Sequence, residues 1–383
     1  MPSCRFLVLD DDPDIGLLLV SAIQSMDFEG RAVSTFEAFD HALMEWKPTH
    51  ISLDLQMPGY DGVETIRALA ERGCSARIML ISGVDSKVLE MAAMLGRERG
   101  LDIAGTMMKP WRFNELTALV RKIAANDEIL GPAALARAIE QNELRLYLQP
   151  KVRLPGGEIY GFEALVRWQH PQLGLQTPDR FIPVAEQNNL MEPLTRWVIA
   201  SAADVLAAWQ AEGLNPGIAV NISAKNLSAL SIADDFAQIV QSRGLECSSF
   251  TLELTESAAI TNLVDALDIL VRLRLKNFAL SIDDFGTGYS SLAQLQRMPF
   301  TELKVDRSFV SAGVHSPEAV ATIRAAVDLA RRLDLNVVAE GIETLEAEQL
   351  VIDLGIDCAQ GYRYGRPQSI EASTTLLRQS HMG

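Results

Sequence analysis

The chain has 383 residues, of which 48% are hydrophobic and 22% charged, a balance typical of a globular protein with two or three domains. Its formal net charge of -16 argues against general nucleic-acid binding, because the phosphate backbone would be repelled. An anionic substrate would therefore need local positive charge, such as bound divalent cations.

Cysteine usage and hydropathy bear on the location of the protein. The four cysteines are scattered, with no CxxC spacing, so neither a disulfide framework nor a zinc site is indicated. No apolar run approaches the ~20 residues of a membrane-spanning helix, and acidic residues follow the N-terminal methionine too early for a signal peptide. We expect a cytoplasmic protein without a membrane segment and without direct nucleic-acid binding.

The first part of the chain alternates short apolar runs with amphipathic segments. An apolar run at Phe6–Leu9 precedes a helical pattern from Asp14 to Met26, and the alternation closes with a helix at Arg112–Ala125. Further strands are expected at Ile51–Leu55, Ile78–Ile81 and Gly105–Met108. Alternating β and α units predict an α/β domain with a doubly wound parallel sheet over residues 1–125.

A polar segment followed by Gly131-Pro132 predicts a short linker at residues 126–133 and a second domain at 134–383. Because the linker is short, we expect the two domains to be closely coupled. Eight strands in about 250 residues match the number and size of a (β/α)8 barrel. These strands are expected at Arg145–Gln149, Tyr160–Val166, Ile218–Ile222, Phe250–Leu254, Phe278–Asp283, Glu302–Asp306, Asn336–Glu340 and Ile356–Gln360.

Polar residues follow the strands of the first domain, at the edge where doubly wound sheets bind ligands. They are Asp10, Asp11, Asp54, Ser82 and Lys109. Clustered carboxylates repel one another unless a divalent cation or a lysine neutralises them. The set suits an aspartate that accepts a phosphoryl group, with Mg2+ and a lysine balancing the charge. Acids at strand ends are commonly only surface charges, so the prediction depends on all five residues occurring together.

These residues resemble the receiver domains of two-component signalling: Asp10-Asp11 after FLVL, Asp54 in DLQMPGYDG, Ser82, and Lys109-Pro110. The resemblance implies a (βα)5 fold, phosphorylation of Asp54, Mg2+ binding by Asp10 and Asp11, and a cis Lys109–Pro110 peptide. It also implies a sensor histidine kinase or phosphotransfer protein as partner. Many receivers carry an aromatic residue three positions before the lysine, where this chain has Thr106. The route and the direction of regulation therefore stay open here.

Oxygen-bearing side chains end the expected barrel strands, the edge at which barrel enzymes place catalytic residues. Carboxylate and amide oxygens without thiolate or imidazole favour Mg2+ or Mn2+, and the number of acids indicates two ions, as in phosphodiester hydrolysis. Any one acid is equally well explained as a solubilising or helix-capping residue, but the whole set is not. The set comprises Glu163, Asn221, Glu253, Asp283, Asp284, Lys304, Glu340 and Gln360, with Lys304 as its one cation.

The second half resembles the EAL family of cyclic di-GMP phosphodiesterases, which hydrolyse the cyclic dinucleotide to linear pGpG. The resemblance implies a modified (β/α)8 barrel whose first strand is antiparallel to its neighbour. Within QGYRYGRP, Arg363 stands where an apolar residue is usual. The matching segments are EALVRW from Glu163, NIS from Asn221, ELTE from Glu253, DDFGTGYSSL from Asp283, LKVD with Lys304, AEGIE from Glu340, and QGY from Gln360.

The resemblance also implies a role for each matching residue. Glu163, Asn221, Glu253 and Asp283 would hold one metal ion, Asp283 and Asp284 would serve a second, and Gln360 would support the metal site. Lys304 would be the general base or the group that orients water, Glu340 would support that water, and Glu256 would hold the DFGTG loop. The implied substrate contacts are Gln149, Arg167 and Glu343.

A receiver followed directly by an EAL domain resembles response regulators with a phosphodiesterase output. The sequence therefore predicts cyclic di-GMP hydrolysis controlled by receiver phosphorylation, and a homo-oligomer formed through the EAL domain. One alternative is a non-catalytic cyclic di-GMP sensor, but such domains typically lose metal ligands, the lysine or the loop motif, and this chain keeps them all. Another is a scaffold whose receiver only dimerises, which the intact acidic sets in both halves disfavour.

Overall fold

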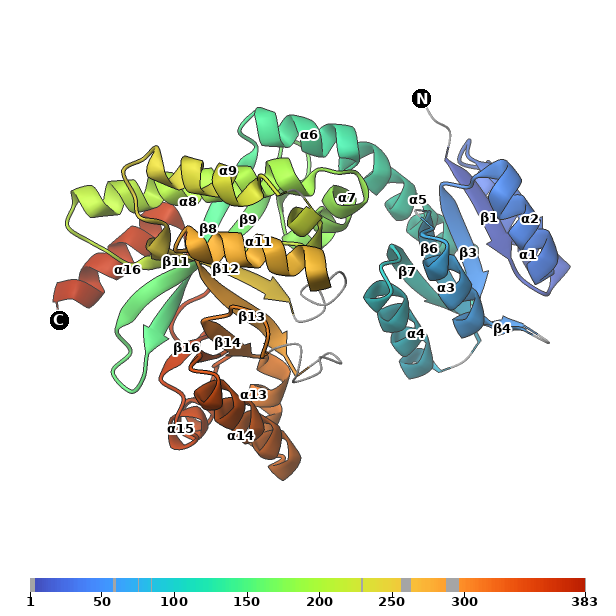
Figure 1. Ribbon diagram of the computed structural model, residues 1–383. Coiled ribbons are helices and arrows are strands. Elements are labelled where there is room, and N and C mark those ends of the chain that lie inside the picture. Colours follow the sequence, from blue (N-terminus) through green and yellow to red (C-terminus); the bar gives the residue numbers. More distant parts are fainter. Residues whose placement is uncertain are drawn as a thin grey trace. The chain divides into compact units, whose positions relative to one another are not determined.

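The computed structural model describes residues 4–57, 60–74, 76–83, 85–228, 230–255, 263–286 and 296–382. The chain divides into two compact units, residues 1–134 and 135–383 (Figure 1).

The first unit contains a five-stranded parallel sheet in the order β2-β1-β3-β6-β7. Its strands are β1 (Arg5–Leu9), β2 (Glu29–Val33), β3 (His50–Asp54), β6 (Arg77–Ser82) and β7 (Ile103–Met108). Its helices are α1 (Pro13–Gln24), α2 (Phe36–Trp46), α3 (Gly62–Glu71), α4 (Ser86–Glu98) and α5 (Phe113–Ile129). A two-stranded ribbon of β4 (Gln56–Met57) and β5 (Tyr60–Asp61) follows β3.

Both faces of this sheet are buried, as expected for a doubly wound fold. On β1, Leu7 and Leu9 pack in a cluster with residues of α2, α3 and α4, whereas Phe6 and Val8 pack in a second cluster with residues of α1 and α5. Side chains that cap first-turn amides fix where helices begin, for example Asp12 at α1 and Asp85 at α4. The predicted fold class of this domain is confirmed.

Two elements of the first unit differ from the sequence expectation. Strand β2 was not predicted, because its sequence EGRAV is short, partly charged and without a buried residue, as is common at a sheet edge. Helix α5 continues to Ile129, four residues beyond the predicted end at Ala125, so part of the expected linker is helical. Helix α6 (Pro132–Glu140) begins three residues after α5 ends.

The second unit is a closed barrel. Seven strands run parallel, and β8 pairs antiparallel with both β9 and β16, which closes the barrel and confirms the predicted direction of the first strand. The barrel strands are β8 (Leu144–Arg153), β9 (Ile159–His170), β11 (Gly217–Asn221), β12 (Phe250–Thr255), β13 (Ala279–Phe285), β14 (Glu302–Val305), β15 (Asn336–Ala339) and β16 (Cys358–Gln360). Short strands β10 (Gly174–Gln176) and β17 (Gln368–Ser369) extend it.

Helices surround the barrel strands (Figure 1). They are α7 (Ile182–Gln187), α8 (Met191–Ala211), α9 (Ile232–Gln241), α11 (Leu263–Leu275), α13 (Arg307–Gly313), α14 (Pro317–Arg332), α15 (Leu345–Asp353) and α16 (Ile370–Met382). The longest of them, α8, buries a stripe that includes Leu194, Val198 and Leu206. Across the described ranges, no helix combines the length and the hydropathy that crossing a membrane requires.

Candidate phosphoryl-acceptor site and candidate metal-dependent active site

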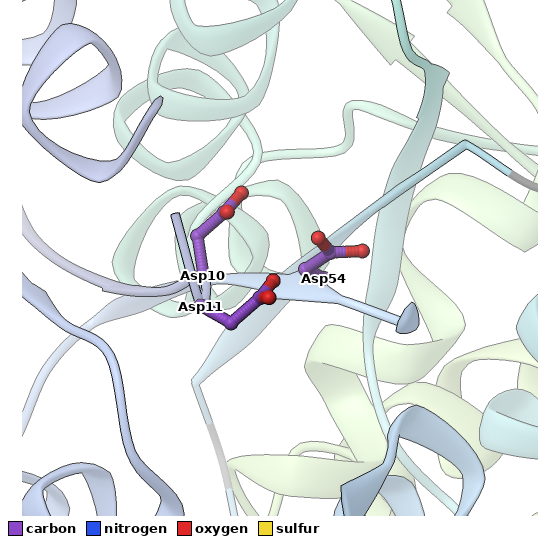
Figure 2. A group of neighbouring side chains, drawn as sticks. All are labelled: Asp10, Asp11 and Asp54. Atoms are coloured by element: carbon purple, nitrogen blue, oxygen red, sulfur yellow. The ribbon is translucent and has the colours of Figure 1, made fainter. Parts of the chain in front are cut away.

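The acidic residues of the first unit meet at the carboxyl edge of its sheet. Because β1 and β3 are parallel neighbours with Leu9 opposite Leu53, the next residues, Asp10 and Asp54, lie side by side. Asp10, Asp11 and Asp54 each offer one carboxylate oxygen, and these three atoms lie within 4.8 Å of one another. Figure 2 shows the three side chains as one group. The structure therefore brings together the three acids that the sequence analysis grouped.

Lys109 contacts two of these acids. Its Nζ lies 2.8 Å from Asp10 Oδ2 and 2.5 Å from Asp54 Oδ2. Burial raises the pKa of Asp10, and nearby Asp54 adds to this although Lys109 opposes it. Burial would lower the pKa of Lys109, but Asp10 and Asp54 outweigh it and the pKa is raised. Three acids facing one ammonium group fit a divalent cation.

The remaining receiver residues also lie near this edge. Ser82 is buried at the end of β6, and its carbonyl oxygen accepts a 2.8 Å hydrogen bond from the Lys109 amide. The Lys109–Pro110 peptide is cis, as the resemblance implied. Thr106 lies on β7 opposite Leu80, and its side chain is exposed.

In the second unit, Lys304 lies at the centre of the acidic residues at the barrel rim. Its Nζ is 2.7 Å from Glu340 Oε1, 2.8 Å from Glu253 Oε2 and 3.1 Å from Asp283 Oδ1. The Lys304 side chain is only 1% exposed. Glu253 and Asp283 lie near the carboxyl ends of β12 and β13, and Glu340 directly follows β15, so parallel strands of one sheet deliver all three acids to one ammonium group.

Amide side chains complete the rim beside Glu163. Asn221 Nδ2 donates to Glu163 Oε1 at 2.7 Å, and Gln360 Nε2 donates to Glu163 Oε2 at 2.5 Å and to Gln149 Oε1 at 3.0 Å. Gln360 Oε1 is buried and has no hydrogen-bond partner within the described part of the chain. A buried acceptor without a donor is costly unless something pairs with it, and a bound cation would do so.

The paired aspartates lie where β13 departs from regular geometry. Successive side chains of a strand normally point to opposite faces, but the β13–β14 register shifts between Ile282 and Phe285, and Asp284 has a φ of 55°. A ligand oxygen of Asp283, of Asp284 and of Glu340 can therefore lie within 4.8 Å of one another. This local irregularity lets two consecutive acids serve one site, as bulges beside active sites commonly do.

The crowded acids at the rim resist ionisation together. Burial raises the pKa of Asp283 to about 8, with Glu340 and Glu253 adding to the effect and Lys304 opposing it. Burial likewise raises the pKa of Glu340 to about 7, and burial followed by the charge of Asp306 raises that of Asp284. The protein alone supplies too little positive charge for this set of acids, which fits divalent cations at this position.

The pKa shifts of Glu253 and Lys304, in contrast, both favour the charged form of the side chain. Burial would raise the pKa of Glu253, but Lys304 and Lys151 outweigh it, so the pKa is lowered. Burial would lower the pKa of Lys304, but the surrounding carboxylates, Glu163 first, hold it well above its ordinary value. Both groups are therefore charged at neutral pH.

Sequence reasoning missed a second buried cation. Lys304 is the one cation of the predicted set, and the structure adds a second cation from outside that set, because Lys151 Nζ lies 3.2 Å from Glu253 Oε1 and 2.9 Å from Glu302 Oε1. Lys151 lies two residues after Gln149 on β8, and alternation within a longer strand would have placed both on the barrel interior. Asp306, directly after β14, is a further acid near Asp284 that was not assigned.

The expected substrate contacts line a cavity beside the rim. The cavity has a volume of about 270 Å³. Its walls include Gln149, Glu163, Arg167, Arg307, Glu340, Glu343, Gln360 and Tyr362. Glu256 and residues 287–295, which include Gly288 of the glycine-bearing loop, lie outside the described residues.

The unusual Arg363 points away from this chemistry. Its Nε donates to Glu348 Oε2 of α15 at 3.0 Å, and the neighbouring Tyr364 hydroxyl donates to Glu348 Oε1 at 2.8 Å. Glu348 thus ties the segment after β16 to α15. The arginine therefore takes part in an ion pair with α15 near the protein surface.

Comparison with known proteins agrees with a barrel enzyme joined to a receiver. Residues 133–367 match the EAL domain, and residues 6–121 match the response regulator receiver domain. The chain belongs to the EAL domain family, with an N-terminal receiver. It is 31% identical over 380 residues to the cyclic di-GMP phosphodiesterase RocR of Pseudomonas aeruginosa, covering 96% of this chain and 97% of that protein.

Solved structures show the same likeness. The phosphodiesterase PaMucR in complex with c-di-GMP is 40% identical, with a TM-score of 0.60, over 63% of this chain and 98% of that chain. The EAL enzyme Bd1971, in its cAMP- and cyclic-di-GMP-bound form, is 26% identical, with a TM-score of 0.63, over 83% of this chain and 80% of that chain.

Proposed function

We propose that this protein hydrolyses cyclic di-GMP to linear pGpG, using two divalent cations, Mg2+ or Mn2+, at the barrel rim. The observation that carries the proposal is the group of acids that contacts Lys304. Within the described part of the chain, every rim residue expected of an EAL phosphodiesterase is present. The family membership and the full-length likeness to RocR support the same substrate. Water would add to one phosphorus while the bond to a ribose 3′ oxygen breaks, which releases pGpG.

The charges in and beside the barrel interior support two cations. Lys304 faces five carboxylates at the rim, which leaves an excess of four negative charges when all are ionised, while the charges of Lys151 and Glu302 offset each other in a separate ion pair. An excess of this size fits more than one divalent cation. The five carboxylates are Glu163, Glu253, Asp283, Asp284 and Glu340.

Each rim residue has a role in this proposal. Glu163, Asn221, Glu253 and Asp283 would hold one cation and Asp283 with Asp284 the other, and Gln360, whose Oε1 has no hydrogen-bond partner among the described residues, would support the site. When bound, such ions polarise the phosphodiester and lower the pKa of the attacking water. Lys304, charged and held by three acids, would orient water and stabilise phosphoryl oxygens. Glu340 would fix that lysine.

The substrate would extend from the rim into the neighbouring cavity. Arg167 and Glu343 line this cavity together with Gln149, so a guanidinium group and a carboxylate are available to hydrogen-bond a guanine or a phosphate. Arg167 is half-buried, and its guanidinium lies 5.7 Å from the centre of the Tyr147 ring, which restricts its position.

The test of this function is a product assay with the full-length protein. Incubation with cyclic di-GMP and Mg2+ or Mn2+ should yield pGpG on ion-pair chromatography, and EDTA should abolish the product. Ca2+ should inhibit, because it accepts looser geometry that misplaces the attacking water. Intact binding of cyclic di-GMP with no pGpG in either metal would instead establish a non-catalytic sensor.

We further propose that the receiver regulates the barrel through phosphorylation of Asp54 by a sensor histidine kinase or a phosphotransfer protein, with Mg2+ held by Asp10 and Asp11. A phosphoryl group adds about one and a half to two negative charges, which Mg2+, Lys109 and Ser82 must accommodate. Exposed Thr106 lacks the bulk of an aromatic switch. The signal would instead follow the Ser82 end of β6 and helix α5, which leads along the chain to α6.

Beryllofluoride, a phosphoryl mimic, should therefore change the turnover of the wild-type enzyme. Activation is the expected direction, because an enzymatic response regulator is normally switched on by its signal. The same addition to Asp54→Asn should leave turnover unchanged, since the acceptor oxygen is lost. Turnover is measured in all four combinations at saturating Mg2+. Four equal rates would show that this aspartate does not control the barrel.

A further inference from the structure

A second buried lysine lies directly beside one of the proposed metal ligands. Lys151 has a side chain only 3% exposed, and its Nζ contacts Glu253 Oε1 at 3.2 Å and Glu302 Oε1 at 2.9 Å. It comes from β8, the one barrel strand that runs against its neighbours. None of the roles assigned above uses it.

The two contacts of Lys151 join two layers of the barrel interior. Glu302 precedes Lys304 by two residues on β14, so its side chain lies on the same face but one layer deeper from the rim. Glu253 contacts Lys304 at the rim itself. Lys151 therefore links the deeper layer to the rim layer through a single ammonium group.

Glu253 is consequently held between two lysines. Its Oε1 accepts from Lys151 at 3.2 Å and its Oε2 from Lys304 at 2.8 Å, and its side chain is fully buried. Each carboxylate oxygen has two lone pairs, so these bonds still leave acceptor capacity for a cation. The terminal torsion angle of a glutamate side chain normally takes a broad range of values. With both oxygens hydrogen-bonded, the carboxylate of Glu253 cannot rotate freely about that torsion.

A purely structural reading would treat Lys151 and Glu302 as a buried ion pair, which is weak evidence of stability by itself. That pair does not require the third partner, Glu253. Both acids hold the pKa of Lys151 well above its ordinary value although burial lowers it, so the ammonium stays charged. A simple Lys151–Glu302 ion pair does not explain why Lys151 also contacts Glu253, the proposed metal ligand.

We infer that Lys151 is a positioning residue that fixes the carboxylate of Glu253 for divalent-cation binding at the barrel rim. The inference rests on the proposed metal-dependent function. Outer partners of metal ligands typically change metal affinity by about 10- to 100-fold when they are removed. Lys151 would thus set metal affinity without touching the substrate.

The test removes the pair without leaving a lone buried charge. In the full-length double variant Lys151→Met/Glu302→Leu, two apolar side chains of similar size replace the ions, a change that is often neutral for stability. Mn2+ binding is measured from the decrease in the EPR signal of free Mn2+. The same measurement on the corresponding protein with Asp283→Asn reports binding at the receiver cluster alone, and this contribution is subtracted. The dissociation constant at the barrel should rise about tenfold, with the melting temperature of the metal-free protein little changed.

The control is Glu302→Gln, which keeps Lys151 on Glu253 and should bind Mn2+ within about twofold of the wild type. The metal concentration for half-maximal turnover should shift with the dissociation constant in the double variant, while the KM for cyclic di-GMP stays near that of the wild type. If the double variant does not fold, Lys151→Gln/Glu302→Gln is measured in the same way, with the same expected shift.

Two results would overturn the inference: unchanged or tighter Mn2+ binding in the double variant, or equal weakening in the Glu302→Gln control. Either result leaves the proposed function intact as long as the wild-type protein binds Mn2+ in a manner sensitive to Asp283→Asn. If the wild type shows no such binding, the metal-dependent function itself fails, and the two failures are thereby distinguished.

Discussion

Replacing Asp283 with asparagine is expected to lower turnover of cyclic di-GMP by at least about 1000-fold, or about 4 kcal/mol of barrier. Asp283 lies in contact with Lys304 and shares a cluster with Asp284 and Glu340, so it is the one acid proposed to serve both cations. Asparagine keeps the shape of the side chain but removes its charge. The measurement is the rate of pGpG formation at saturating Mn2+ by chromatography.

A matched control separates this effect from a general loss of charge. Asp268 pairs with Arg272 one turn further along α11, and its side chain is 50% exposed. Asp268→Asn should keep turnover within about twofold, because exposed ion pairs contribute little. Alanine at Glu163, Asn221 or Glu253 should likewise remove most turnover. An Asp283→Asn enzyme with near-normal rates, or a wild type fully active in excess EDTA, would refute the two-cation proposal.

Replacing Lys304 with methionine should reduce turnover by at least about 100-fold while cyclic di-GMP still binds. The sequence left two roles open, general base or water-orienting group. The three carboxylate contacts and the raised pKa keep the ammonium protonated, which favours orientation and charge stabilisation. Methionine retains the length of the side chain and removes the charge.

Two measurements define the outcome for Lys304. Turnover is recorded at saturating Mn2+, and substrate affinity is measured by calorimetry with Ca2+, which is expected to support binding without hydrolysis. A melting curve in the presence of Mn2+ checks folding, since loss of a buried cation among acids is costly unless metal replaces its charge. A folded Lys304→Met enzyme with nearly normal turnover would show that the cations activate water unaided.

The sequence alone determined the two α/β domains and most of their strands. Apolar runs that alternate with amphipathic helices are local patterns, and burial of a sheet on both faces leaves few architectures that satisfy them. Parallel strands bring their carboxyl ends to one edge of a sheet or barrel. Asp54 could therefore be assigned to the site of the first domain, and Glu253 to that of the second, before any geometry was known. Strand β2 escaped because an exposed edge strand lacks an apolar signal.

Tertiary structure decided what depends on pairing between distant residues. Strand β8 was expected to end at Gln149, before Pro150, yet it continues to Arg153, and this places Lys151 beside Glu253, 102 residues away. Because proline lacks an amide hydrogen to donate to a neighbouring strand, Pro150 indicated the end of the strand and not its continuation. The bulge that turns Asp284 toward Asp283 likewise arises from the β13–β14 register. Composition and spacing fix which charges are present, but only the closed barrel determines which of them share one buried ammonium group, because that depends on how strands far apart in sequence are paired.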